Sequence, residues 1–123
     1  MTGGLRSFLG VVAVGAAVTV TAQWFGDRAQ AGLGEQLAQV AQPGDIRMVS
    51  SLTCPSCTAA RMWLQQHGVA FDECLIERDA ACAATFQALP VRATPTLFVR
   101  GQVHTGFDAE RVLRALQAAP APR

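Results

Sequence analysis

SSLTCPSCTAARMWL, residues 50–64, joins the end of an apolar run to a segment whose apolar residues recur at helical spacing. The run from Ile46 to Leu52 is typical of a strand, and Pro55 to Gln66 of a helix. Cys54 therefore lies at a helix N-terminus, and Pro55 takes the first helical position, where its missing N–H costs nothing. Backbone N–H groups and the helix dipole favour a thiolate there, so we expect the Cys54 pKa to fall below ~8.5 and Cys54 to be a nucleophile.

Cys57 lies one helical turn after Cys54. A thiol at this position can attack a mixed disulfide formed by Cys54, release the product and leave a Cys54–Cys57 disulfide. The alternative is half of a zinc site, but zinc takes four ligands. The other cysteines and the histidines form no second close-spaced pair: they are Cys74, Cys82, His67 and His104. We expect thiol–disulfide chemistry, no metal and no bound cofactor.

The segments after this helix predict an α/β fold with the order β-α-β-α-β-β-α. They are a strand from Ala70 to Ile76, a helix from Ala80 to Leu89 capped by Asp79, strands Thr96 to Val99 and Gln102 to His104 joined at Arg100-Gly101, and a helix after Asp108. The first three strands should share one sheet, and the last hairpin should be antiparallel. Helices must cover both faces of this small sheet to bury it.

The N-terminal residues 1–26 predict a targeting segment, because no charge occurs from Ser7 to Gly26 and Phe8 to Val20 is apolar. It is either a cleaved signal peptide or a membrane anchor of about 20 residues, and the alternative is a buried core helix. In both targeting cases Arg6 stays inside and everything after Gly26 is exported, in a bacterium to the periplasm.

Residues 27–44 predict an amphipathic spacer, since Leu33, Leu37 and Val40 have helical spacing and Pro43-Gly44 ends the pattern. The spacer lies either on the membrane surface or on the domain. We place the domain at residues 45–118 and a disordered tail at 119–123.

The composition gives no support for a nucleic-acid partner, and the predicted export changes how the cysteines are interpreted. A net charge of +1 in 123 residues leaves no basic patch for nucleic acid. Disulfides form and persist outside the cytosol, so at least one is expected among the four cysteines. Cys74 and Cys82 either pack in the core as thiols or form a second disulfide.

Three motifs resemble one family. CPSCTAAR, residues 54–61, resembles the CPxCxxAR signature of glutaredoxins, ATPTLFV, residues 93–99, resembles the cis-proline strand of the thioredoxin superfamily, and GFDAERVLRAL, residues 106–116, is similar to the glutaredoxin C-terminal helix. The resemblance covers residues 45–118. It implies a thioredoxin fold with Pro95 in cis beside the cysteines and with the Thr94 backbone free to pair with an extended substrate.

The resemblance also implies a thiol–disulfide oxidoreductase that acts on protein disulfides or on glutathione mixed disulfides. In glutaredoxins the segment matching Thr105 to Asp108 helps to hold glutathione. Many glutaredoxins carry a basic residue before the first cysteine, an aromatic residue between the cysteines and valine before the cis-proline, whereas this chain has Thr53, Ser56 and Thr94. Arg92 is either an attractor for anionic substrates or a solvated arginine.

The candidate substrate contacts are Thr53, Pro55, Ser56, Arg92, Thr94, Pro95, Gly106, Phe107 and Asp108. Trp63 lies on the apolar face of the first helix and either packs in the core or flanks a substrate groove. A membrane electron donor is a further expected partner. The alternative function is a binding module, in which the pair holds a metal or an iron–sulfur cluster or the fold serves only for docking.

Overall fold

The computed structural model describes residues 3–118, so the tail expected at 119–123 lies outside the described residues. The chain divides into two compact units, Met1–Gly32 and Leu33–Arg123. Helix α1 (Gly3–Val40) contributes to both units, and its last turns belong to the second.

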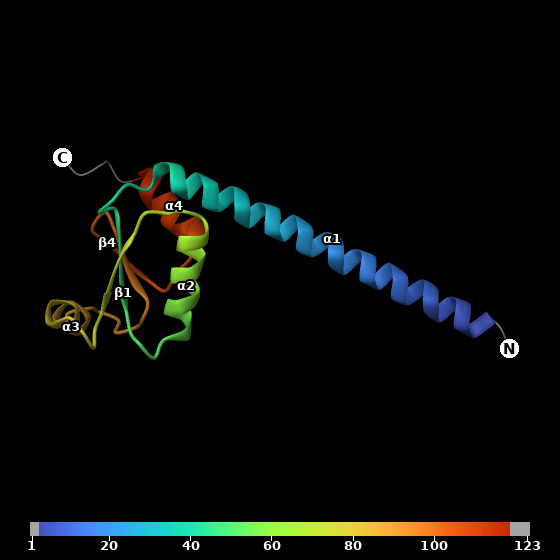
Figure 1. The fold of residues 1–123 in the computed structure, drawn as a ribbon, viewed down its shortest axis with the longest axis horizontal. Coiled ribbons are helices and arrows are strands. Elements are labelled where there is room, and N and C mark those ends of the chain that lie inside the picture. The colour runs from blue at the N-terminus through green and yellow to red at the C-terminus, as the bar shows by residue number, and fades with distance from the viewer. Residues whose placement is uncertain (1–2, 119–123) are drawn as a thin grey trace. The chain divides into compact units, whose positions relative to one another are not determined.

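The second unit is built on a four-stranded sheet in the order β2-β1-β3-β4 (Figure 1). Its strands are β1 (Ile46–Ser50), β2 (Asp72–Leu75), β3 (Thr96–Val99) and β4 (Gln102–Thr105). β1 pairs with β2 in parallel, and the β1–β3 and β3–β4 pairs are antiparallel. The predicted shared sheet and antiparallel hairpin are therefore confirmed.

Three further helices complete the predicted order: α2 (Pro55–Gln66), α3 (Ala80–Gln87) and α4 (Ala109–Ala118). The predicted ends of α2 and β3 match the structure, whereas β1 ends at Ser50 and not at Leu52. The reason is that residues 51–53 turn away to bind a side chain near the cysteines, described below. Arg100 and Gly101 form the β3–β4 turn, both with positive φ, at 48° and 86°.

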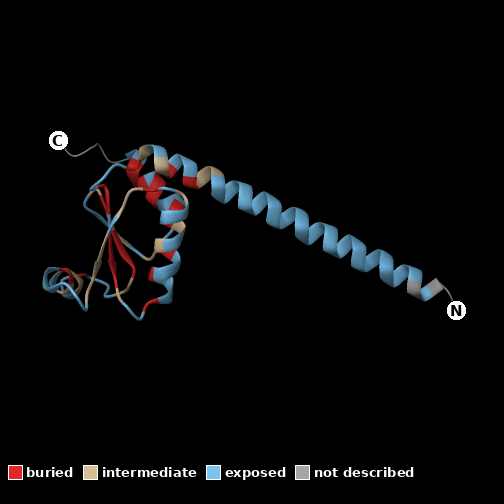
Figure 2. Ribbon diagram, in the orientation of Figure 1, coloured by how far each residue is buried: buried red, intermediate tan, exposed pale blue. Residues whose placement is uncertain are grey.

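The sheet is covered on both faces, as expected. Ile46, Met48 and Leu97 are fully buried on one face, which packs against α2, α4 and the end of α1. On the other face Val49 and Cys82 are fully buried. Figure 1 shows α3 across the sheet from α2, and Figure 2 shows the buried residues concentrated on the central strands and the helix faces toward them.

The predicted spacer at residues 27–44 ends inside the domain. Leu37 is fully buried, Ala41 is 8% exposed, and Leu33 and Val40 pack against the same core. The sequence left open whether this stretch lies on a membrane or on the domain, and its last turns lie on the domain. The compact unit thus begins at Leu33, before the boundary that we placed at residue 45.

The first unit is an apolar helix without a core of its own. Its large apolar side chains from Phe8 to Phe25 are all more than half exposed (Figure 2). By length and composition the helix can cross a membrane, a property that N-terminal signal sequences share. At its end the Trp24 and Phe25 rings meet edge to face at 5.7 Å, and the Arg28 guanidinium lies 3.5 Å from the Trp24 ring centre.

Candidate active site around Cys54 and Cys57

Cys54 is the N-cap residue of α2 and forms a disulfide with Cys57, with 5.2 Å between the two Cα atoms. Its backbone is extended, and its Sγ accepts a hydrogen bond from the Cys57 N–H at 3.1 Å. Cys54 is 8% exposed and Cys57 is fully buried. Of the two residues, Cys54 alone keeps some exposed surface, and its role as the nucleophile stays a prediction.

Glu77 holds the residues that lead into Cys54. Its carboxylate accepts hydrogen bonds from the Ser51 hydroxyl and from the Leu52 N–H, and the Ser51 Oγ accepts one from the Thr53 N–H at 3.3 Å. The Ser51 hydroxyl above all, with the Leu52 N–H, holds the pKa of Glu77 below its ordinary value. Sequence analysis missed this contact, because a surface glutamate after a strand carries no signal of it.

The cis-proline loop closes against the cysteine pair. The Thr94–Pro95 peptide bond is cis, as the resemblance implied. The Ser56 Oγ lies 3.3 Å from the Cys54 Sγ and 3.4 Å from the Thr94 carbonyl, to which it can donate. Within residues 3–118 no group accepts a hydrogen bond from the Thr94 N–H. The backbone at Thr94 thus retains a donor for a substrate.

A third segment joins the site through the Gly106 N–H, which donates to the Pro95 carbonyl at 2.8 Å. Between this segment and α2 lies a groove of about 440 Å³. Its lining consists of Ser56, Ala59, Ala60, Trp63, Ala93, Thr94, Pro95, Thr105, Gly106 and Phe107. The Trp63 and Phe107 rings lie side by side in it, with centres 5.4 Å apart.

Four predicted contacts do not line this groove. Thr53, Pro55 and Arg92 are exposed and lie outside the lining. Asp108 caps α4, because its carboxylate accepts from the Arg111 N–H at 3.0 Å and pairs with the Arg111 side chain at 3.6 Å. The Arg111 N–H above all holds the pKa of Asp108 below its ordinary value. The predicted cap is confirmed, but the carboxylate occupies the helix end at which an anion would bind.

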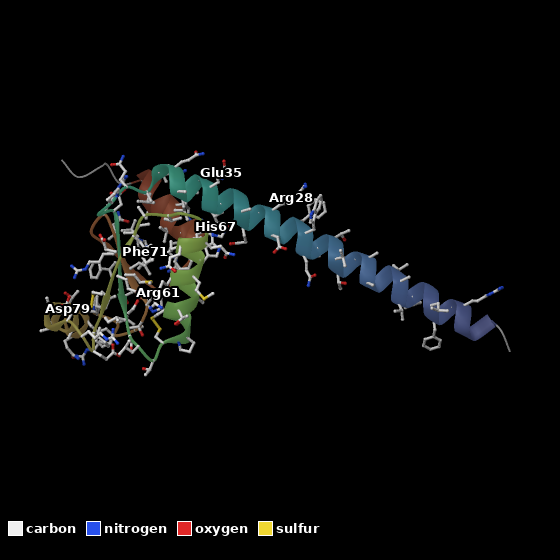
Figure 3. All side chains as sticks on the ribbon, viewed as in Figure 1. Arg28, Glu35, Arg61, His67, Phe71 and Asp79 are labelled. Atoms are coloured by element: carbon white, nitrogen blue, oxygen red, sulfur yellow. A yellow bond between two sulfur atoms is a disulfide. The ribbon has the colours of Figure 1, made fainter. Side chains whose placement is uncertain are left out.

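Arg61, the arginine of the CPSCTAAR motif, binds the sheet and not the groove. Its Nε and Nη2 donate to the Glu73 carboxylate at 2.7 and 3.0 Å, and the buried Ser50 hydroxyl donates to the same carboxylate at 2.8 Å. Glu73 raises the pKa of Arg61 through this hydrogen bond. Figure 3 shows Arg61 on α2, beside the strands. The pair thus holds the helix that carries both cysteines against β2.

Cys74 and Cys82 form a second disulfide, with Cα atoms 6.0 Å apart. Of the two alternatives left open by the sequence, the structure has the disulfide. Asp79 caps the start of α3, the helix that carries Cys82, as predicted: its Oδ1 accepts hydrogen bonds from the Ala81 and Cys82 N–H groups at 2.9 and 3.1 Å.

The part of the chain that the structure describes contains no group of three or more His, Cys, Asp or Glu residues arranged to hold a metal ion. His67 is the C-cap residue of α2, and its ring stacks on Trp63 with centres 4.1 Å apart. His104, on β4, has a buried Nε2 without a hydrogen-bond partner among the described residues.

Comparison with known proteins finds similarity to the glutaredoxin family and to a thioredoxin-like protein. Residues 46–104 match the family model described as Glutaredoxin. The crystal structure of the thioredoxin-like protein BC3987 matches with a TM-score of 0.51 and 27% identity, over 57% of this chain and 97% of that chain. A mutant of that protein matches at 28% identity, with a TM-score of 0.51, over 58% of this chain and 97% of that chain.

The holo form of glutaredoxin C1 from Populus tremula x tremuloides has a TM-score of 0.48 and 20% identity, over 73% of this chain and 97% of that chain. No curated protein matches the sequence. The family match and the likeness to the thioredoxin-like protein confirm the predicted fold.

Proposed function

Residues 46–104 form a domain of the glutaredoxin family, and from this premise we propose that the protein is a thiol–disulfide oxidoreductase that works outside the cytosol. One observation carries the proposal. The Cys54–Cys57 disulfide lies at the start of a helix, with Cys54 8% exposed and Cys57 fully buried, beside a cis-proline loop. This asymmetry gives each sulfur a separate role.

In the oxidised protein a substrate thiolate attacks the Cys54 sulfur and forms a mixed disulfide. The Cys54–Cys57 bond breaks, and Cys57 leaves as a thiolate that takes up a proton. A second substrate thiolate then attacks the substrate sulfur of the mixed disulfide and releases the Cys54 thiolate. The α2 N-terminus stabilises this thiolate. The substrate has lost two electrons, and the reverse sequence reduces a substrate disulfide.

The proposed substrates are protein disulfides or glutathione mixed disulfides. In the reducing direction a donor must return two electrons to the pair, and we assign this role to a membrane electron donor. Export to the periplasm is supported by the apolar helix that precedes the domain. Export also agrees with two disulfides in one small domain, because such bonds persist in oxidising compartments.

The test uses the full chain in detergent, with a disulfide-bonded peptide as substrate and dithiothreitol as reductant. The wild type should accelerate reduction of the peptide. Cys54→Ser should fall to the uncatalysed rate. Reduced Cys57→Ser, freed of dithiothreitol before the peptide is added, should accumulate a mixed disulfide visible by intact mass. Met62→Ser, which changes an exposed residue of the same helix, is the control and should retain the rate.

A Cys54→Ser variant with wild-type turnover would overturn the proposal. The docking alternative predicts that this variant still binds its partner and that no species is trapped. Expression of Cys57→Ser in cells, followed by mass spectrometry of the trapped adducts, then separates glutathione from protein substrates.

A further inference from the structure

We propose that the groove between α2 and the Thr105–Phe107 segment takes a large apolar side chain next to a substrate cysteine, so that the substrate is a protein segment and not glutathione. The inference rests on the proposed thiol–disulfide exchange and names its substrate class.

The groove offers no charge to glutathione. At neutral pH glutathione carries two carboxylates and one ammonium group, whereas every residue that lines the groove is uncharged. The three arginines nearest to the lining in sequence are not part of it: Arg61 binds Glu73, Arg92 is exposed outside the lining, and Arg111 donates to the Thr105 carbonyl at 3.2 Å and pairs with Asp108. A carboxylate that enters this groove would lose water without gaining a cationic partner.

The same lining suits an apolar side chain. Trp63 and Phe107 supply two adjacent aromatic faces, and the small side chains of Ala59, Ala60 and Ala93 leave the space beside them open. Sites lined mainly by apolar and aromatic groups, with a few polar groups at one end, bind apolar ligand groups.

The aromatic wall is held in place before any substrate arrives. The His67 ring stacks on Trp63, and the His67 Nδ1–H donates a hydrogen bond to the Trp63 carbonyl at 2.8 Å. A preorganised wall loses little side-chain freedom on binding, so more of the burial energy contributes to affinity. Figure 3 shows His67 near the end of α2, where it supports this wall.

The groove is continuous with the reacting sulfur. Ser56 lines the groove, and its Oγ is 3.3 Å from the Cys54 Sγ. A substrate cysteine at Cys54 therefore brings its neighbouring residue to the groove entrance. Leu52 and Val91 are more than half exposed on the two loops that precede Cys54 and Pro95.

The test measures how fast thiols reduce the Cys54–Cys57 disulfide of the oxidised full chain in detergent. The probes are glutathione and short peptides with blocked termini, each with one cysteine flanked by phenylalanine, leucine, serine or glutamate. Each rate is divided by the rate of the same thiol with a small free disulfide, which removes differences in thiol reactivity. The phenylalanine and leucine peptides should exceed glutathione and the glutamate peptide by about tenfold, since partial burial of one large side chain has this effect.

A charge placed in the groove should reverse the preference. Ala59→Arg adds a cation at an exposed helix position in the lining, whereas Gln65→Arg adds the same cation at an exposed position of α2 outside it. Ala59→Arg should raise the glutathione rate about threefold, the effect of one exposed ion pair, and lower the phenylalanine peptide rate. Gln65→Arg should change neither rate.

Two outcomes would overturn the inference while leaving the proposed function intact. In the first, glutathione equals or exceeds the apolar peptides in the wild type. In the second, Ala59→Arg and Gln65→Arg change the rates alike, so that the effect comes from overall charge and not from the groove. If no thiol reduces the Cys54–Cys57 disulfide faster than it reduces the small free disulfide, the proposed function itself fails.

Discussion

Arg100 and Asp45 form the most buried ion pair among the described residues, with side chains 11% and 6% exposed. Two guanidinium nitrogens donate to the two carboxylate oxygens at 3.2 Å, and a third donates to the Leu116 carbonyl at 2.7 Å. The pair therefore joins the start of β1, the β3–β4 turn and α4. The Arg100 hydrogen bond is the main reason why the pKa of Asp45 lies below its ordinary value.

Asp45→Asn should lower the free energy of unfolding at pH 7 by about 3 kcal/mol, because it removes the carboxylate charge that pairs with the buried Arg100 guanidinium. A lowered folded-state pKa stabilises the protein above the unfolded pKa of ~3.9, and this contribution is lost as pH falls through the folded value. The difference between wild type and variant should therefore shrink below about pH 4. Denaturant unfolding of the full chain in detergent at pH 7, 5 and 3, followed by tryptophan fluorescence, measures it.

Asp72→Asn is the matched control, since Asp72 is exposed on β2, and it should change the free energy of unfolding by less than about 0.5 kcal/mol. An equal loss for Asp45→Asn at all three pH values would show that the charge of Asp45 does not carry the effect.

Among elements, the end of α1 and the end of α2 approach closely at Gly34. A Cβ atom on Gly34 would lie 2.0 Å from the His67 Cδ2 and 2.8 Å from the His67 Cβ. Only glycine leaves room for this ring. The helix contact and the Trp63 wall of the groove therefore depend on the same histidine.

Gly34→Ala should displace His67 and cost about 1–3 kcal/mol of unfolding free energy, the usual effect of overpacking. In a His67→Ala background Gly34→Ala should cost much less, because the ring with which it would clash is absent. Gly32→Ala is the control, since nothing lies within 4 Å of a Cβ there, and it should be neutral or stabilising. Additive losses in the double variant would exclude the contact as the cause.

At the scale of the whole molecule, the Cys74–Cys82 disulfide ties α3 to the edge strand β2, at a sequence separation of 8. Cross-linking so short a loop stabilises the folded state by about 2.5 kcal/mol through the unfolded chain. We expect the double variant Cys74→Ala, Cys82→Ala to lose about this amount in denaturant unfolding and to retain thiol exchange at Cys54. A variant as stable as the wild type would show that the bond does not stabilise the domain.

The N-terminal unit leads to a prediction about the mature protein. Trp24 and Phe25 lie at the end of the uncharged run, and Trp and Tyr, with basic residues nearby, are typical of membrane interfaces. We expect the helix to remain as an anchor, so that the chain stays in membranes after alkaline carbonate washing and its intact mass includes residues 1–26. A soluble product that lacks the apolar run from Phe8 to Val20 would identify a cleaved signal peptide instead.

Local sequence was sufficient for the order of elements, for the position of Cys54 at a helix N-terminus and for the caps Asp79 and Asp108. These features depend on spacing and on backbone groups a few residues away, so the local sequence is enough to predict them. The start of the domain at Leu33 could not be predicted in this way, because amphipathic spacing does not say which surface will cover an apolar face.

Contacts between residues distant in sequence could be identified only in the tertiary structure. The Arg61–Glu73 pair, the Arg100–Asp45 pair and the approach of His67 to Gly34 join segments whose distance depends on how helices lie on the sheet. The choice between thiols and a bond for Cys74 and Cys82 also required a Cα separation that spacing does not supply. The uncharged groove beside Cys54 is of the same kind, since three separate segments form its walls.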